Sequence, residues 1–132
     1  MIEFTLAIKP FSVNAYRYRD ARFKTAEARA WEVAVSEALE EHRKPLMEMA
    51  DDFKAKGGTF RLFLSALYPK FVYYNKSGAV SAKTVDVSNF EKPIQDMLFN
   101  FMGVNDRFVT ELISTKDIGA ITSVWIKLEL HQ

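Results

Sequence analysis

The fold is decided by the segment at positions 88–101, which reads SNFEKPIQDMLFNF. Its large apolar side chains recur at intervals of three and four residues, the spacing that places them on one face of a helix. They are Phe90, Ile94, Met97, Leu98 and Phe101. Gly103 follows two residues later and suits the left-handed conformation that commonly ends a helix. The segment therefore predicts an amphipathic helix.

Segments with strand-like patterns lie on both sides of this predicted helix. Positions 1–9 alternate apolar and polar side chains, and a stretch rich in Phe and Leu follows later. Phe71–Tyr74 is expected to continue that second strand or to pair with it after Pro69. The last two strands should join at Asp117–Gly119, with consecutive elements adjacent in space. The expected strands are positions 1–9, Thr59–Leu67, Arg107–Lys116 and Ala120–Leu130.

Two helical pieces are expected between the first and second strands. Thr25 is a good N-cap residue, and the apolar residues after it recur at helical spacing. This helix should end near Pro45, and Leu46–Lys56 should continue helically after a break. The order of elements predicts an α+β fold, with a mixed sheet of about four to five strands and two main helices on one face.

Composition limits the class of protein. At 132 residues the chain has the size of one compact domain, so we expect a single domain over 1–132. The absence of cysteine excludes disulfides, a thiol nucleophile and thiolate metal sites. No apolar run is long enough for a membrane span, and the N-terminus lacks a signal-peptide pattern. A cytoplasmic protein without membrane contact is expected.

The formal net charge is only +1, but the charges are unevenly distributed. Basic residues crowd into positions 17–29, whereas acidic residues dominate Glu37–Asp52. Nucleic-acid binding depends on where positive charges lie more than on their sum. The basic segment is therefore a candidate DNA contact, and two ordinary solvated faces are the alternative.

Carboxylates flank the predicted helix at both ends, with Asp86 before it and Asp106 after it. A helix of about three turns separates its ends by about 15 to 20 Å. The helix alone therefore cannot bring these carboxylates together. Either the strand entered at Asp106 runs back alongside the helix start, or a dimer interface completes the site.

Each of these residues also has a purely structural interpretation. Ser88 and Glu91 have the spacing of a capping box, and a carboxylate at Asp86 is favoured by the helix dipole without any metal. Lys92 and Asp96 are four residues apart and can form a surface ion pair. Asn105-Asp106 after a glycine can be a turn.

Taken together, the pattern resembles the signature of the RusA family of Holliday junction resolvases. That signature is commonly Asp-x-Asp-Asn-x-x-Lys-x-x-x-Asp, followed after one helix by a second Asp-containing turn. The positions that match are Asp86, Asn89, Lys92, Asp96 and Asp106. The segment at positions 10–16, PFSVNAY, is also similar to the family's entry segment. Ser88 and Asn105 depart from the signature, because many members carry acidic residues there.

The resemblance implies a homodimer that binds four-way DNA junctions and introduces paired symmetric nicks, leaving 5′-phosphate and 3′-hydroxyl ends. It implies Mg²⁺ as cofactor, with Mn²⁺ as a possible substitute. Asp86, Lys92 and Asp106 would be catalytic, and Asp86, Asp106 and Asp96 would bind the metal. Ser88 and Asn89 would support these ligands. With two acidic positions missing, we expect weaker metal affinity than in a member that has all four carboxylates.

DNA contacts are expected mainly from the segment between the first strand and the first helix. Lysine and arginine side chains there can contact phosphates, and tyrosines can stack on bases opened at a junction. The predicted DNA-binding residues are Asn14, Tyr16, Arg17, Arg19, Arg22, Lys24 and Lys76, with Lys70 and Lys83 as further phosphate contacts.

Two other classes of function remain open from the sequence. With Ser88 and Asn105 in place of carboxylates, one alternative is a non-catalytic protein that binds branched DNA on the same scaffold. A small interaction protein, in which the carboxylates only cap helices and turns, would have no DNA affinity even at low salt.

Overall fold

A computed structural model describes residues 1–15 and 24–132 of the chain. Within these residues, four strands form one sheet in the order β1-β4-β2-β3. The strand β4 pairs antiparallel with both β1 and β2, and β2 pairs parallel with β3. The sheet is therefore mixed, as predicted. The strands are β1 (Ile2–Leu6), β2 (Thr59–Tyr68), β3 (Val109–Ile118) and β4 (Ser123–His131).

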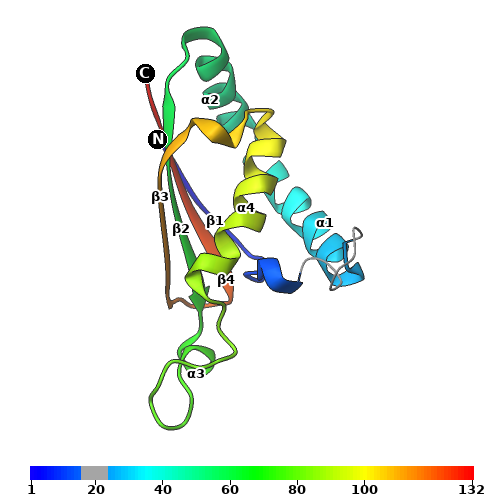
Figure 1. Cartoon of the computed structure of the whole chain (residues 1–132), viewed down its shortest axis with the longest axis vertical. Helices are drawn as coiled ribbons and strands as arrows, with labels where there is room; N and C mark the ends of the chain where they lie inside the picture. The colour runs from blue at the N-terminus through cyan, green and yellow to red at the C-terminus, as the bar shows by residue number, and fades with distance from the viewer. Residues whose placement is uncertain (16–23) are drawn as a thin grey trace.

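The three long helices lie on one side of this sheet (Figure 1). They are α1 (Ala26–Glu40), α2 (Arg43–Lys56) and α4 (Val87–Met102). The α+β class is confirmed, with three long helices where two main helices were expected. The predicted cap of α1 is also confirmed, because the Thr25 hydroxyl accepts a hydrogen bond from the Ala28 N–H at 3.0 Å. The break between α1 and α2 falls before Arg43, and Pro45 lies in the first turn of α2, where its missing N–H costs nothing.

The apolar face of α4 packs onto the sheet as its spacing predicted. Phe90, Ile94 and Leu98 are at most 1% exposed. Phe99 meets Phe60 of β2 edge to face, with ring centroids 5.4 Å apart. Gly103 ends the helix in the left-handed conformation, at φ +69°. Burial of this face against the sheet fixes which side of α4 remains exposed.

The last two strands do not form the expected hairpin. The strand β2 lies between β3 and β4, so their connection crosses over the end of β2. The Gly119 N–H donates to the Tyr68 carbonyl at 2.9 Å. A Cβ at Gly119 would lie only 3.0 Å from the Leu67 Cβ, so a side chain there would crowd this crossing. The expectation that β3 and β4 pair with each other was wrong, because each of them pairs with a different edge of β2.

The segment after Pro69 is a short helix and not a strand. It is α3 (Lys70–Tyr73), in which the Tyr73 N–H donates to the Pro69 carbonyl at 2.9 Å. Together with the loop that follows, α3 projects beyond the end of the sheet (Figure 1). Phe71 is 84% exposed on this projection.

Two short 3-10 helices, η1 (Val13–Ala15) and η2 (Asp106–Phe108), lie near the motifs that the sequence singled out. The predicted basic loop continues through residues 16–23, which lie outside the described residues. In the described ranges, no helix has the length and apolarity to cross a bilayer. The cytoplasmic location stays a prediction.

Candidate functional site

The start of α4 differs from the predicted capping box. Asp86 occupies the N-cap position with extended backbone, and its side chain makes no capping hydrogen bond to the helix. Its carbonyl accepts from the Asn89 N–H at 2.9 Å. Because the helix already begins at Val87, Ser88 lies inside the first turn and cannot cap it with Glu91. The Asp86 carboxylate and the Ser88 side chain are both left exposed.

The strand β3 runs back along α4. This is the first of the two arrangements that the sequence left open for bringing Asp86 and Asp106 together. The Ser114 hydroxyl donates to the Val87 carbonyl at the helix start, at 3.0 Å. Asp106, however, lies in η2 at the opposite end of α4. Between described residues, no hydrogen bond or ion pair joins Asp86 to Asp106. The returning strand therefore brings Ser114, and not Asp106, to the helix start.

Asp106 instead meets the middle of α4 through Lys92. The Lys92 Nζ lies 2.6 Å from Asp96 Oδ1 and 3.3 Å from Asp106 Oδ2. The predicted Lys92–Asp96 ion pair is present and extended by a third residue. Three of the five signature residues thus form one cluster.

Lys92 carries its full charge in this cluster. The hydrogen bond to Asp96 raises the pKa of Lys92 above its usual value, with a smaller contribution from Asp106. Burial acts in the opposite direction but does not cancel this effect. The ammonium is therefore protonated throughout the neutral range.

The signature residues share one exposed stripe of α4, called here the α4 stripe: Asp86, Asn89, Lys92 and Asp96. Their spacings of three, three and four residues keep them on one side of the helix. Phe90 and Ile94 are buried, whereas the side chains of Lys92 and Asp96 are 58% and 44% exposed. Asp86 and Asn89 border one pocket, whereas Lys92 and Asp96 border another that Asp106 also lines.

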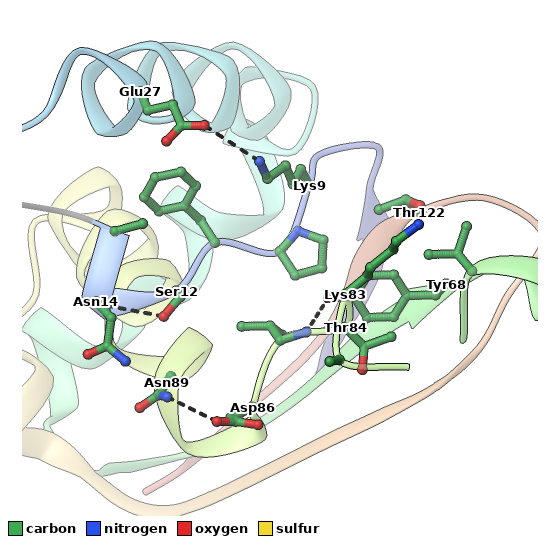
Figure 2. Close-up of a pocket in the computed structure, with 16 residues that line it drawn as sticks. Lys9, Ser12, Asn14, Glu27, Tyr68, Lys83, Thr84, Asp86, Asn89 and Thr122 are labelled. Carbon is green, nitrogen blue, oxygen red and sulfur yellow. Dashed lines mark hydrogen bonds and ion pairs between the residues drawn. The ribbon is translucent and has the colours of Figure 1, made fainter. Parts of the chain in front are cut away.

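An open pocket of about 500 Å³ adjoins the Asp86 end of the stripe (Figure 2). At its edge the Asn89 amide points toward Asp86 Oδ2, at 3.4 Å. Asn14 of η1 lines the same pocket, and its N–H donates to the Ser12 hydroxyl at 3.1 Å. The N-terminal motif and the central motif therefore meet around one cavity, although more than 70 positions separate them in the sequence.

Asn105 has a structural role in the second motif. Its side-chain oxygen accepts from the Arg107 N–H at 2.9 Å and so caps η2. The interpretation of Asn105-Asp106 as a turn is confirmed. Asp106 directly follows this cap, which directs its carboxylate toward Lys92.

The predicted DNA-binding residues lie in different parts of the chain. Asn14 lines the pocket, and Lys76 lies in the loop after α3. The Lys24 ammonium forms an ion pair with Glu32 at 2.9 Å, so phosphate would compete with a carboxylate there. The others, Tyr16, Arg17, Arg19 and Arg22, lie outside the described residues.

Sequence reasoning missed several residues that border the pocket, among them Lys9, Tyr68 and Thr122. Lys9 and Thr122 lie in segments whose pattern indicated only strands, and Tyr68 directly follows such a segment. Tyr68 directly follows the expected strand Thr59–Leu67; in the structure it ends β2 and is 5% exposed. No local signal marks these positions, because only the pairing of distant strands brings them to α4.

The fold and the site define a small α+β protein with an exposed carboxylate and lysine stripe beside a polar pocket, an arrangement suited to phosphodiester chemistry. The chain matches the family model described as Endodeoxyribonuclease RusA over residues 8–129, so it belongs to this family. No curated protein matches the chain. The resemblance seen in the sequence is confirmed.

Membership defines the general activity. The protein is an endodeoxyribonuclease of the class that resolves Holliday junctions, and it hydrolyses phosphodiester bonds in DNA recombination and repair. Branched DNA is the substrate class that the family implies, and a divalent metal is its general requirement.

Proposed function

We propose that residues 1–132 form one nuclease domain that resolves four-way junctions by paired symmetric nicks, with Mg²⁺ as cofactor and Asp86, Lys92 and Asp106 as catalytic residues. The observation that carries the proposal is that Lys92, on the α4 stripe that begins at Asp86, contacts both Asp96 and Asp106. Carboxylates and a cation lie together on an exposed face, where a DNA backbone can approach.

The side chains of this site suit Mg²⁺ in the chemistry of their donors. The candidate ligands are all oxygen donors, which hard cations prefer. Among the described residues, no three Asp, Glu, His or Cys side chains gather as a ready-made metal site. Mg²⁺ tolerates this, since it is commonly held by one or two carboxylates together with waters and substrate phosphates.

We assign Asp86 and Asp106 as the main metal ligands, with Asp96 as a further ligand. Mn²⁺ is a possible substitute because it favours the same oxygen donors. When bound, the ion would polarise the scissile phosphate and lower the pKa of the attacking water.

Lys92 is proposed to stabilise the negative charge that develops on the phosphate oxygens during cleavage. Its raised pKa supports this role, because the ammonium stays charged at neutral pH. Asp96 and Asp106 hold the ammonium from two sides and limit the directions it can take. A phosphate that approaches the α4 stripe would meet a preoriented cation.

Asn89 and Ser88 support the Asp86 carboxylate. The contact of the Asn89 amide with Asp86 Oδ2 restricts the rotation of that carboxylate. Ser88 offers a hydroxyl oxygen where many members of the family offer a carboxylate. A neutral donor attracts a cation less strongly, so we expect a high Mg²⁺ requirement.

DNA binding is proposed to extend from the pocket in two directions. In the chain, Asn14 is followed by the basic segment. That segment holds Tyr16, Arg17, Arg19, Arg22 and Lys24. On the other side, Lys83 lines the pocket and Lys76 follows on the projecting loop. These contacts to phosphate would be independent of base sequence and sensitive to salt.

A homodimer is proposed because paired nicks on opposite strands require two sites related by symmetry. A two-fold axis in the protein would match the two-fold symmetry of a four-way junction. The dimer then holds two sites, each built either from one chain or from both.

The test is cleavage of a labelled synthetic four-way junction by the wild type and by Asp86→Asn, with Mg²⁺ or EDTA, beside a linear duplex. We expect paired nicks that need Mg²⁺ and disappear in Asp86→Asn, while junction binding persists. Asp51→Asn, which changes an exposed carboxylate on α2, is the matched control. Tight binding without nicks in the wild type would contradict the catalytic proposal and leave a branched-DNA-binding protein.

A further inference from the structure

The backbone around Asp86 is held by side chains that reach across from the sheet. The Tyr68 hydroxyl of β2 accepts from the Val85 N–H at 2.9 Å. The Lys116 ammonium of β3 donates to the Val85 carbonyl at 3.3 Å and to the Thr84 hydroxyl at 3.1 Å. Peptide groups directly before Asp86 are thus bonded on both their N–H and their carbonyl sides.

A third side chain holds the residue directly after Asp86. The Ser114 hydroxyl donates to the Val87 carbonyl at 3.0 Å. Ser114 and Lys116 are two residues apart on β3, so both point to the sheet face that carries α4. We call Tyr68, Ser114 and Lys116 the sheet clamp.

The sheet clamp is well shielded from water on the side of Tyr68 and Thr84. Tyr68 is 5% exposed and Thr84 is 6% exposed. Burial raises the pKa of the Tyr68 hydroxyl, so it remains neutral over the working pH range. Hydrogen bonds in such surroundings are costly to leave unmade. The clamp therefore restrains the backbone more firmly than solvent-exposed contacts would.

The clamp also stands on a rigid base. The strands β2 and β3 are adjacent and parallel, and Ala66 pairs with Lys116 while Leu64 pairs with Ser114. Groups mounted on paired strands keep their positions better than groups on loops. By contrast, the Asp86 side chain itself is exposed, and among the described residues its hydrogen-bond partner is the Asn89 amide.

We propose that Tyr68, Ser114 and Lys116 are positioning residues for junction cleavage, because they fix the backbone that carries Asp86 and so direct its carboxylate. This inference rests on the proposed role of Asp86. None of the three side chains needs to touch DNA. In enzymes, a displacement of about 1 Å at a reacting group can lower the rate about 100-fold.

The chain offers a matched control for each clamp residue. Ser114→Ala is paired with Thr115→Ala, since the Thr115 hydroxyl donates to Ser65 at 3.0 Å and does not contact residues 84–87. Lys116→Met is paired with Lys127→Met, which removes a lysine that pairs with Glu129 on β4.

Tyr68→Phe is paired with Tyr73→Phe, a change of one hydroxyl on α3. Lys116→Arg serves as the conservative variant, because it keeps a charged donor.

The experiment measures three quantities for every variant: kcat and KM on the four-way junction, the thermal midpoint, and amide hydrogen exchange in the peptide that contains Val85. We expect the clamp variants to lower kcat by roughly 10- to 100-fold with KM changed less than about 2-fold. Exchange at Val85 should accelerate, and Lys116→Arg should recover part of the loss. The control variants should leave kcat and the exchange of this peptide unchanged.

Two results would overturn the positioning role. One is a kcat that falls no further in the clamp variants than in their matched controls at equal thermal midpoints. The other is faster exchange at Val85 with an unchanged kcat. A wild-type protein that leaves junctions intact would instead overturn the proposed function itself, so the two failures are distinguishable.

Discussion

At the scale of single residues, Lys92 is the cation on which the site depends. Lys92→Met removes the charge but keeps most of the apolar stem. We expect kcat on the junction to fall by about 100- to 1,000-fold, as when a preoriented donor is removed from other active sites. Junction affinity should change far less, because many other cations contact phosphate. Lys44→Met, on the exposed face of α2, is the control in the same steady-state assay.

The pH dependence of this ion cluster follows from the direction of the Lys92 shift. A raised pKa in the folded state means that the stabilisation is fully present below the usual lysine value of 10.5 and is lost as pH rises through the shifted value. Thermal midpoints of the wild type and Lys92→Met should therefore differ by a constant, small amount through neutral pH. The difference should shrink only above about 10.5. A difference that already vanishes near neutral pH would contradict the assignment.

A substitution at Ser88 is expected to strengthen metal binding. It lies exposed in the first turn of α4, where a carboxylate is also favoured by the helix dipole. Ser88→Asp should lower the Mg²⁺ concentration for half-maximal cleavage several-fold, since a charged oxygen ligand is added. Mn²⁺ binding followed by electron paramagnetic resonance should tighten in parallel. Ser88→Asn tests whether charge or size is responsible, and Mn²⁺ binding by Ser88→Asp that is no tighter than in the wild type would remove Ser88 from the metal site.

At the scale of elements, the α3 projection carries the next prediction. Residues 69–85 contain Lys70, Lys76 and Lys83 but no acidic residue, and Phe71 is 84% exposed among them. Since an unpaired base can stack on an exposed ring, we expect Phe71→Ala to weaken junction binding roughly 10-fold. Duplex binding should barely change, and Phe71→Trp should restore affinity. Val33→Ala, an exposed apolar residue of α1, is the control in the same gel-shift titration.

Elements differ in how far the sequence alone predicts them. The spacing of Phe90, Ile94 and Leu98 predicted α4 well, because one face of that helix is buried along its whole length. The pattern of Phe71–Tyr74 misled, since Pro69 ends the strand and the next N–H groups turn back onto the Pro69 carbonyl. Local apolar composition cannot distinguish such a turn from a strand.

For the candidate site too, the sequence predicted which residues take part but not all of the contacts between them. The motif identified Asp86, Lys92 and Asp106, and the ion pair of Lys92 with Asp96 followed from helix spacing alone. The bond of Lys92 to Asp106 depends on how η2 turns after Gly103. Lys116 meets Val85 only because β2 lies between β3 and β4. Such contacts arise from non-local strand order, which no local pattern contains.

At the scale of the whole molecule, the paired-nick proposal makes a prediction about mixed dimers. If each copy supplies one site, wild-type and Asp86→Asn chains combined in one dimer should cut one strand only. On a supercoiled plasmid with a cruciform, wild-type dimers should give linear product, whereas mixed dimers should give nicked circles. Sedimentation must first establish a dimer at the assay concentration, and differently tagged chains allow the mixed species to be isolated.

The alternative arrangement predicts a different product from the same assay. If each site takes Asp86 from one chain and Asp106 from its partner, a mixture of Asp86→Asn and Asp106→Asn chains regains one intact site. That mixture should then nick the cruciform, although either variant alone is inactive. Because the structure joins Lys92 and Asp106 within one chain but shows no bond from Asp86 to Asp106, the result decides where the site is completed. Nicking by the mixture would assign each site to two chains, and its absence would assign each to one.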